Sequence, residues 1–199
     1  FNGKNIVVQG EDRETTIIDG GENGSVVVVQ NSPAIDATIS GFTIQNGSIG
    51  IIPENQGFYA GGGVYIESSN FTINNCIIKD NNIEGRGGGV SCFGGECIVF
   101  NCLIKNNLTT SYGAAIYSHS GPLFVEYSEI VDNYGGAAID KHNGYGIISN
   151  TLIANNGIDG VHFWNTDDFQ INNSTIANNQ RYGVKLREAF GEINNSIFY

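Results

Sequence analysis

One short segment recurs along the chain at nearly constant spacing. It reads NCIIKDN from Asn75 to Asn81 and returns as NCLIKNN from Asn101 to Asn107. Further copies begin at Tyr127, Asn150, Asn173 and Asn195, and a degenerate copy covers residues 41–47. The last Asn of the complete copies falls at positions 81, 107, 133, 156 and 179, which are 26, 26, 23 and 23 residues apart. A period in this range is typical of solenoid proteins, in which each repeat stacks on the next.

The repeat has the hydrophobic pattern of short strands. From Val64 onward the apolar residues alternate with polar ones, and period two indicates β-strands. We read three short strands per repeat, separated by Gly, Asn or Ser turns. One such unit cannot bury its own apolar face, so copies must stack on their neighbours. The chain is therefore predicted to be all-β, a parallel β-helix of about eight coils formed by one chain. The first strand of each coil begins at a small residue followed by Val or Ile, namely Val64, Val90, Ile116, Ile139, Val161 and Val184.

The Asn residues that open the segment fit turns of such a coil. Asn favours backbone with positive φ, and stacked Asn amides can hydrogen-bond along a column. We therefore assign these residues a structural role: Asn75, Asn101, Asn150, Asn173 and Asn195.

Two sequence motifs of the repeat resemble those of known repeat proteins. Gly61-Gly62-Gly63-Val64 and Gly113-Ala114-Ala115-Ile116 pair with Ile78-Lys79-Asp80-Asn81 and Ile130-Val131-Asp132-Asn133. Together they resemble the right-handed parallel β-helix proteins of the pectate-lyase-like superfamily, and also repeats of polymorphic outer-membrane autotransporter passengers. The resemblance implies a right-handed coil over nearly all of residues 1–199. Because this fold carries lyases, hydrolases, epimerases and adhesins, it implies little about function.

The outward positions of the first strand form two columns of side chains, and these columns contain the residues that could bind a ligand or take part in a reaction. All three histidines and the single Trp fall on them. Aromatic faces and hydrogen-bonding side chains together suit a sugar ligand, so we expect glycan contacts from Tyr65, Phe93, Tyr117, His119 and Trp164. An acid, a base and carboxylate-neutralising cations, as a polyuronate lyase needs, could come from Asp140, His142, His162, Lys185 and Arg187. The long links 47–61, 82–88 and 108–114 would place Tyr59, Arg86 and Tyr112 beside this face.

Three functions stay open. The first is an extracellular or cell-surface β-helix with a glycan-binding, adhesive or structural role, which makes the chain a binding module rather than an enzyme. The second is a polysaccharide lyase or related carbohydrate-active enzyme that uses the outer face of the first strand. The third is a self-associating surface filament subunit. A ligand-free sheet face is the alternative to all site assignments.

A second outward surface is unusually apolar. On the second strand, Ile98, Phe100, Phe124 and Ile147 would lie on adjacent coils. Exposed apolar patches commonly mark contact surfaces. We therefore expect either self-association or cover by a loop or a flanking domain.

The cysteines and two polar features complete the list of candidates. We expect Cys76 and Cys102 to be free thiols at an inward position of the repeat that requires a small residue. Cys92 and Cys97 also point inward, and they could form a disulfide bridge with each other. Lys141 also falls in an inward slot, so either the coil bulges there or the lysine is paired. No cofactor is expected, although calcium could bind Asp167 and Asp168, and the cysteine spacing does not predict a zinc site.

Charge limits the partners. The chain contains nine Lys and Arg residues and 20 Asp and Glu residues, which gives a net charge of −11. Clustered basic residues are required to bind nucleic acid, so we expect none to bind. No apolar run is long enough for a transmembrane helix. Residues 1–199 read as a single β-helix domain and an excerpt of a longer chain, since the sequence stops within a coil.

Overall fold

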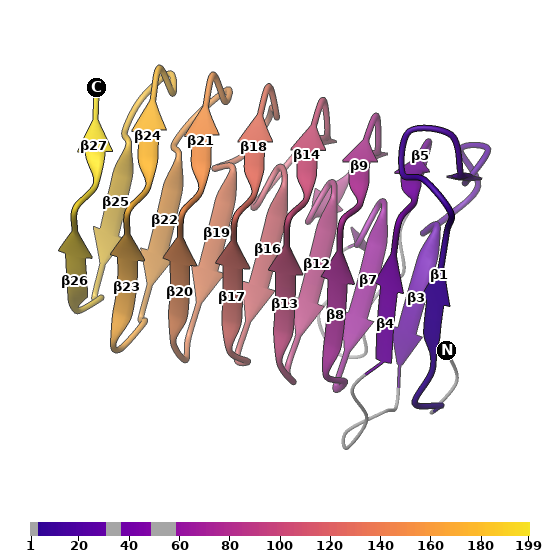
Figure 1. Cartoon of the computed structure of the whole chain (residues 1–199). Coiled ribbons are helices and arrows are strands. Elements are labelled where there is room, and N and C mark those ends of the chain that lie inside the picture. Colours follow the sequence, from indigo (N-terminus) through magenta and orange to yellow (C-terminus); the bar gives the residue numbers. More distant parts are fainter. Residues whose placement is uncertain (1–3, 31–36, 49–58) are drawn as a thin grey trace.

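The protein is a parallel β-helix, described here from a computed structural model. The structure describes residues 4–30, 37–48 and 59–199, and within them every regular element is a strand. The chain passes through three long parallel sheets in turn and then advances by one coil (Figure 1). All registered strand pairs are parallel, because equivalent strands of successive coils lie side by side. The all-β solenoid with three strands per coil is thus confirmed.

Sheet A holds the second strand of each predicted repeat. Its outward positions carry the predicted apolar patch. In spatial order it contains β1 (Val7–Gln9), β4 (Ala37–Ser40), β8 (Phe71–Asn74), β13 (Cys97–Phe100), β17 (Leu123–Glu126), β20 (Gly146–Ser149), β23 (Phe169–Asn172) and β26 (Gly191–Asn194).

Sheet B follows sheet A along the chain and contains the apolar part of the recurring segment. Its members are β2 (Ile17–Asp19), β5 (Thr43–Gln45), β9 (Ile77–Lys79), β14 (Leu103–Lys105), β18 (Glu129–Val131), β21 (Leu152–Ala154), β24 (Thr175–Ala177) and β27 (Ile197–Phe198).

Sheet C contains the first strand of each predicted repeat and carries the predicted functional columns. Two short pairs lie in the links that lead to it, β6 (Tyr59–Ala60) with β11 (Gly85–Arg86), and β10 (Asn82–Ile83) with β15 (Leu108–Thr109). Sheet C contains β3 (Val27–Gln30), β7 (Val64–Glu67), β12 (Val90–Phe93), β16 (Ile116–His119), β19 (Ile139–His142), β22 (Val161–Trp164) and β25 (Val184–Arg187).

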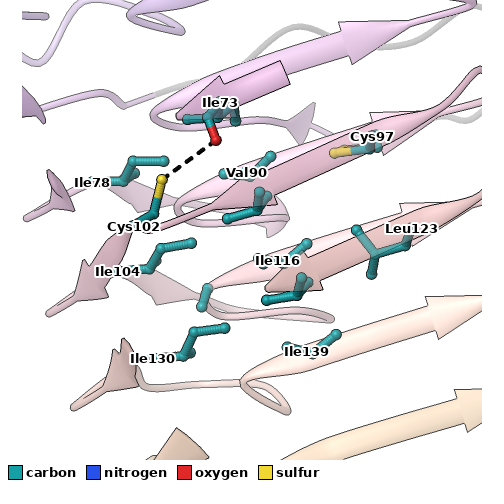
Figure 2. Packing of buried hydrophobic residues seen from close by; sticks show 14 of the residues in the cluster. Ile73, Ile78, Val90, Cys97, Cys102, Ile104, Ile116, Leu123, Ile130 and Ile139 are labelled. Carbon is teal, nitrogen blue, oxygen red and sulfur yellow. Dashed lines mark hydrogen bonds between the residues drawn. A yellow bond between two sulfur atoms is a disulfide. The ribbon is translucent and has the colours of Figure 1, made fainter. Parts of the chain in front are cut away.

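The core runs along the axis between the sheets. Ile78, Ile104 and Ile130 stack from coil to coil, and Val90, Ile116 and Ile139 stack opposite them (Figure 2). All six are fully buried. Similar β-branched side chains at a regular spacing pack layer by layer, which explains why the repeat keeps Ile and Val at these positions.

Asn side chains form a buried ladder after sheet B. Asn81 Nδ2 donates to Asn107 Oδ1 at 2.9 Å, and Asn107 Nδ2 donates to Asn133 Oδ1 at 3.0 Å. The series continues through Asn156 to Asn179 at 3.1 and 2.9 Å. The predicted turn column is a separate one, and its φ values between 48° and 52° from Asn75 to Asn195 confirm that turn role.

The inward cysteines and Lys141 resolve the alternatives left by the sequence. Cys92 and Cys97 form a disulfide, while Cys76 and Cys102 are buried thiols. β19 keeps its register through Lys141, so there is no bulge. The lysine is fully buried and its Nζ donates to the backbone carbonyls of His142, at 3.3 Å, and of Asn143. Burial lowers its pKa to about 8.

Candidate functional site

Parallel register brings three polar side chains together on the outer face of sheet C. Asp140 and His142 are two residues apart on β19 and so share one face. On the neighbouring strand β22, His162 pairs with Asp140 in register, and Trp164 pairs with His142. Residues about 20 positions apart in sequence thus become direct neighbours, as the repeat predicts.

Asp140 accepts hydrogen bonds from both histidines. Its Oδ1 lies 2.7 Å from His142 Nε2 and 3.1 Å from His162 Nδ1. All three residues are buried, with Asp140 at 2% exposure and each histidine at 6%. Burial by itself favours the protonated acid, but the hydrogen bonds from His142 and His162 outweigh it and hold the pKa of Asp140 below its usual value. The cluster therefore centres on a buried carboxylate.

Aromatic rings surround His142. Its centroid lies 4.7 Å from that of Trp164, 5.2 Å from Tyr117 and 5.4 Å from Tyr112, each in an edge-on arrangement. Edge-to-face contacts of this kind favour one ring orientation. The imidazole is thereby held in the orientation that faces Asp140.

A shallow hollow opens beside the cluster. It has a volume of about 290 Å³ and is lined by His119, His142, Asn143, Trp164, Asn165 and Glu188. Two hollows of about 480 Å³ lie elsewhere, one at the last coil and one around Arg13 and Tyr127, and neither is lined by a histidine or Trp. The hollow at Trp164 combines an indole ring and two imidazoles with several other hydrogen-bonding groups.

On β25 the two outward columns of sheet C contain cationic residues. Lys185 pairs with His162, and Arg187 pairs with Trp164. The Arg187 guanidinium lies 4.3 Å from the Trp164 ring centroid, within the range of a cation–π contact. Arg187 is exposed and Lys185 is half-buried, so both border the site on the side of the last coil.

Three of the expected ligand-contacting residues are covered. Tyr65 and Tyr117 are fully buried and Phe93 is 7% exposed. They form a second small apolar cluster with Ala60, against which Tyr112 packs. Links preceding the strands fold over this part of sheet C, and Arg86 in one of them donates to Tyr117 Oη at 2.9 Å. Contact with a ligand at the hollow therefore falls to His119 and Trp164.

Arg86 and Tyr112 lie beside the face as expected. Arg86 sits over both the Tyr112 and Tyr117 rings, at 5.1 and 5.2 Å. The first long link, 47–61, lies mostly outside the described residues.

Sequence reasoning missed the residues that end the strands. Asn143, Asn165 and Glu188 follow the outward column directly and have φ of 54°, 49° and 50°. Asn165 Nδ2 donates to Asn143 Oδ1 at 2.6 Å. The sequence does contain a signal that could have identified them, since all three occupy the same position in the repeat, one residue after His142, Trp164 and Arg187.

The apolar patch lies on sheet A. Ile98, Phe124 and Ile147 are cross-strand neighbours and half-buried, and Phe100 is 39% exposed. The Phe124 ring lies edge-on to the Tyr145 ring at 5.7 Å. Self-association through this patch stays a prediction. Light scattering of the wild type against Phe124→Glu tests it, since a buried carboxylate would prevent association.

Metal-ligating groups gather at one place in the described part of the chain. Asp140, His142 and His162 each offer one donor atom, and these atoms lie within 4.8 Å of one another. Asp167 and Asp168, considered above for calcium, are exposed and lie in the turn between β22 and β23.

The fold and this polar face define a right-handed β-helix with a candidate site on one sheet. The family described as right handed beta helix region matches residues 5–128, and the chain belongs to that family. No curated protein and no solved structure matches the chain. Among the described residues, no helix is long and apolar enough to cross a membrane.

Proposed function

We propose that this β-helix is an extracellular or cell-surface domain that binds a glycan at the hollow beside Trp164. The observation that carries the proposal is the Trp164 ring, half-exposed at the rim and held by Arg187 on neighbouring β25. Concave sites that combine an aromatic surface with a few convergent polar groups are typical ligand sites.

The polar lining suits a hydroxyl-rich ligand. Asn143, Asn165 and Glu188 offer amide and carboxylate groups at the rim, and His119 and His142 offer ring nitrogens. His119 Nδ1 is buried and has no hydrogen-bond partner among the described residues. A sugar ring could pack its C–H face on Trp164 while its hydroxyls bond to these groups.

The disulfide supports the proposed location. Cys92 and Cys97 are bridged within one coil. Structural disulfides persist in oxidising compartments and are rare in the cytosol. The bridge therefore favours an exported domain over a cytosolic one.

A glycan array followed by titration tests the proposal. Trp164→Ala should weaken binding to any array hit by about tenfold or more, because the aromatic surface is lost. The matched control is Tyr145→Ala, which removes an exposed aromatic ring from the sheet A side. Equal affinity of Trp164→Ala and wild type, or no hit among neutral and acidic glycans, would refute the proposal.

One observation favours a second candidate, a polysaccharide lyase. His142 lines the hollow and has the Asp140 carboxylate 2.7 Å behind it, the arrangement of an oriented general base. Lys185 and Arg187 could neutralise a substrate carboxylate. Incubation with uronic-acid polysaccharides, with absorbance read at the wavelength of the unsaturated product, tests it. Product formed by the wild type and not by His142→Gln supports this candidate, and no product from the wild type rejects it.

A further inference from the structure

The Asp140 cluster has the composition and spacing of a metal centre. Asp140, His142 and His162 contribute one oxygen and two imidazole nitrogens, which lie within 4.8 Å of one another on the outer face of sheet C. We propose that these three side chains bind one divalent transition-metal ion of the Zn²⁺ class. The inference does not depend on glycan binding.

The distances are close to those that an ion requires. Bonds of about 2.0–2.1 Å at a tetrahedral angle place two donor atoms about 3.3 Å apart. The oxygen-to-nitrogen distances here are 2.7 and 3.1 Å. The two oxygen-to-nitrogen distances therefore need to lengthen by roughly half an ångström or less, and the two nitrogens, which lie within 4.8 Å of each other, need to reach a similar separation of about 3.3 Å. Side-chain torsions of two rings and one carboxylate can supply this adjustment without moving the strands.

The donor set selects the class of ion. Imidazole suits zinc, copper, iron and nickel, whereas calcium and magnesium require oxygen ligands. One carboxylate and two neutral imidazoles leave a bound divalent ion with a single net positive charge. The ammonium of Lys141 does not oppose it, because that side chain points to the inner face of β19 and donates to the carbonyls of His142 and Asn143.

The surroundings hold the donors in place. The rings of Tyr112, Tyr117 and Trp164 pack edge-on against His142. His162 is 6% exposed, and its Nε2 is buried with no hydrogen-bond partner among the described residues. Its polar contact is therefore at Nδ1, on the side of the cluster. A buried histidine whose second nitrogen is unpaired is held mainly by what its first nitrogen binds.

The cluster also has a route to solvent. His142 lines the hollow together with His119 and Trp164. Three protein ligands leave one position of a tetrahedral ion for water or for an oxygen atom of another molecule. The side of the ion toward the hollow is where that position would be accessible.

Direct titration tests the proposal. The whole chain is treated with a chelator, dialysed, and titrated with Co²⁺ while visible absorption is recorded, and with Zn²⁺ by calorimetry. We expect one ion per chain, a Co²⁺ spectrum of a low-symmetry nitrogen and oxygen site, and a Zn²⁺-dependent rise in Tm because the ion binds the folded state. Absence of stoichiometric binding by the wild type would overturn the proposal and leave a purely hydrogen-bonded cluster.

Variants locate the ion. His162→Gln and Asp140→Asn should each reduce Zn²⁺ affinity by about a hundredfold or more and abolish the Tm shift. His119→Gln is the matched control, a histidine of the same face outside the donor cluster, and should bind as the wild type does. If His162→Gln binds Zn²⁺ like the wild type, the proposed site is wrong. If a variant does not fold, the wild-type stoichiometry and spectrum still decide.

The ion and the lyase candidate exclude each other at His142. When Nε2 of His142 binds Zn²⁺, the neutral imidazole carries its one proton on Nδ1, so neither ring nitrogen has a lone pair that can accept a proton. Lyase assays on chelated and Zn²⁺-loaded chain therefore distinguish a failure of the metal proposal from a failure of the enzyme candidate.

Discussion

At the scale of single residues, buried amides connect the coils. Asn107 Nδ2 donates to Asn133 Oδ1 and to the carbonyls of Ile78 and Lys105, at 3.0, 3.0 and 3.1 Å. Its own Oδ1 accepts from the side chain and backbone of Asn81. Asn133 and Asn156 likewise bond to groups in their own coil and in both neighbouring coils, which explains why the last Asn of the repeat recurs so regularly.

Replacing a ladder residue should destabilise the protein strongly. Asn107→Ala leaves several buried donors and acceptors unpaired, and we expect the free energy of unfolding to fall by about 3 kcal/mol. Urea denaturation measures the change. Asn101→Gly is the control, since Asn101 is an exposed turn residue and Gly adopts its positive φ. Equal stability of the two variants would contradict the role assigned to the ladder.

The two free thiols should be unreactive in the folded protein. Burial raises the pKa of Cys102 to about 12 and also raises that of Cys76. We expect a thiol reagent near pH 8 to label neither residue until denaturant is added, as read by mass spectrometry. Because the folded state holds both protons more tightly, stability should decrease as pH rises above the ordinary thiol pKa of about 8.5. Labelling at the rate of an unfolded control would show that the slots are open.

At the scale of elements, each strand of sheet C directs alternate side chains into the core and onto the outer face of the sheet. On β19, Ile139 and Lys141 point into the core while Asp140 and His142 point outward. Strand alternation makes these assignments readable from sequence. The alternation does not predict whether an outward side chain is exposed to solvent, because exposure depends on which segments fold over that side chain. Tyr117 is buried by Arg86 and Tyr112, whereas Trp164, two strands further along, remains half-exposed.

The disulfide connects two elements and should stabilise their turn. It joins β12 to β13 through two cysteines that are five positions apart in sequence, with Cα atoms 6.5 Å apart. Closing so short a loop restricts the unfolded chain, and we expect Cys92→Ser with Cys97→Ser to lower the free energy of unfolding by about 2 kcal/mol. Denaturant curves of the two proteins measure this difference. Thiol counts on the unfolded wild type supply the control: two without reductant and four with it. Four thiols without reductant would mean that the bridge is absent.

At the scale of the whole molecule, stability comes from contact between successive coils. Leu186, Ile193 and Phe198 occupy the slots held by Phe163, Ile171 and Ile176 one coil earlier. The first three are 49%, 42% and 41% exposed, and the last three are fully buried. Identical slots therefore have different burial according to whether coils lie on both sides.

Hydrogen exchange should follow that gradient. In the 199-residue chain, amides of β12, β16 and β19 should exchange slowest, because coils on both sides must open first. Amides of β25, β26 and β27 should exchange fastest among the strands. Mass spectrometry of peptic fragments measures both. Uniform protection along the three sheets would show that the coils open as one unit instead.

The repeat alone was sufficient to predict the coil, the three strands and the alternation of faces. It placed Asp140 beside His162 and His142 beside Trp164, because residues one period apart become neighbours in a parallel stack. It also assigned Lys141 to an inward position, and only the tertiary structure shows that its ammonium bonds to two backbone carbonyls. The repeat could not show that the links bury Tyr65 and Tyr117, since loops have no period.

By itself, then, the sequence determined the architecture, because periodic hydrophobic positions have one efficient way to bury their surface. Only the tertiary structure decided which outward side chains reach solvent and how the Asp140 carboxylate is shared between two imidazoles. Those outcomes depend on ring rotamers and on links of irregular length, which respond to every neighbour at once rather than to the local pattern.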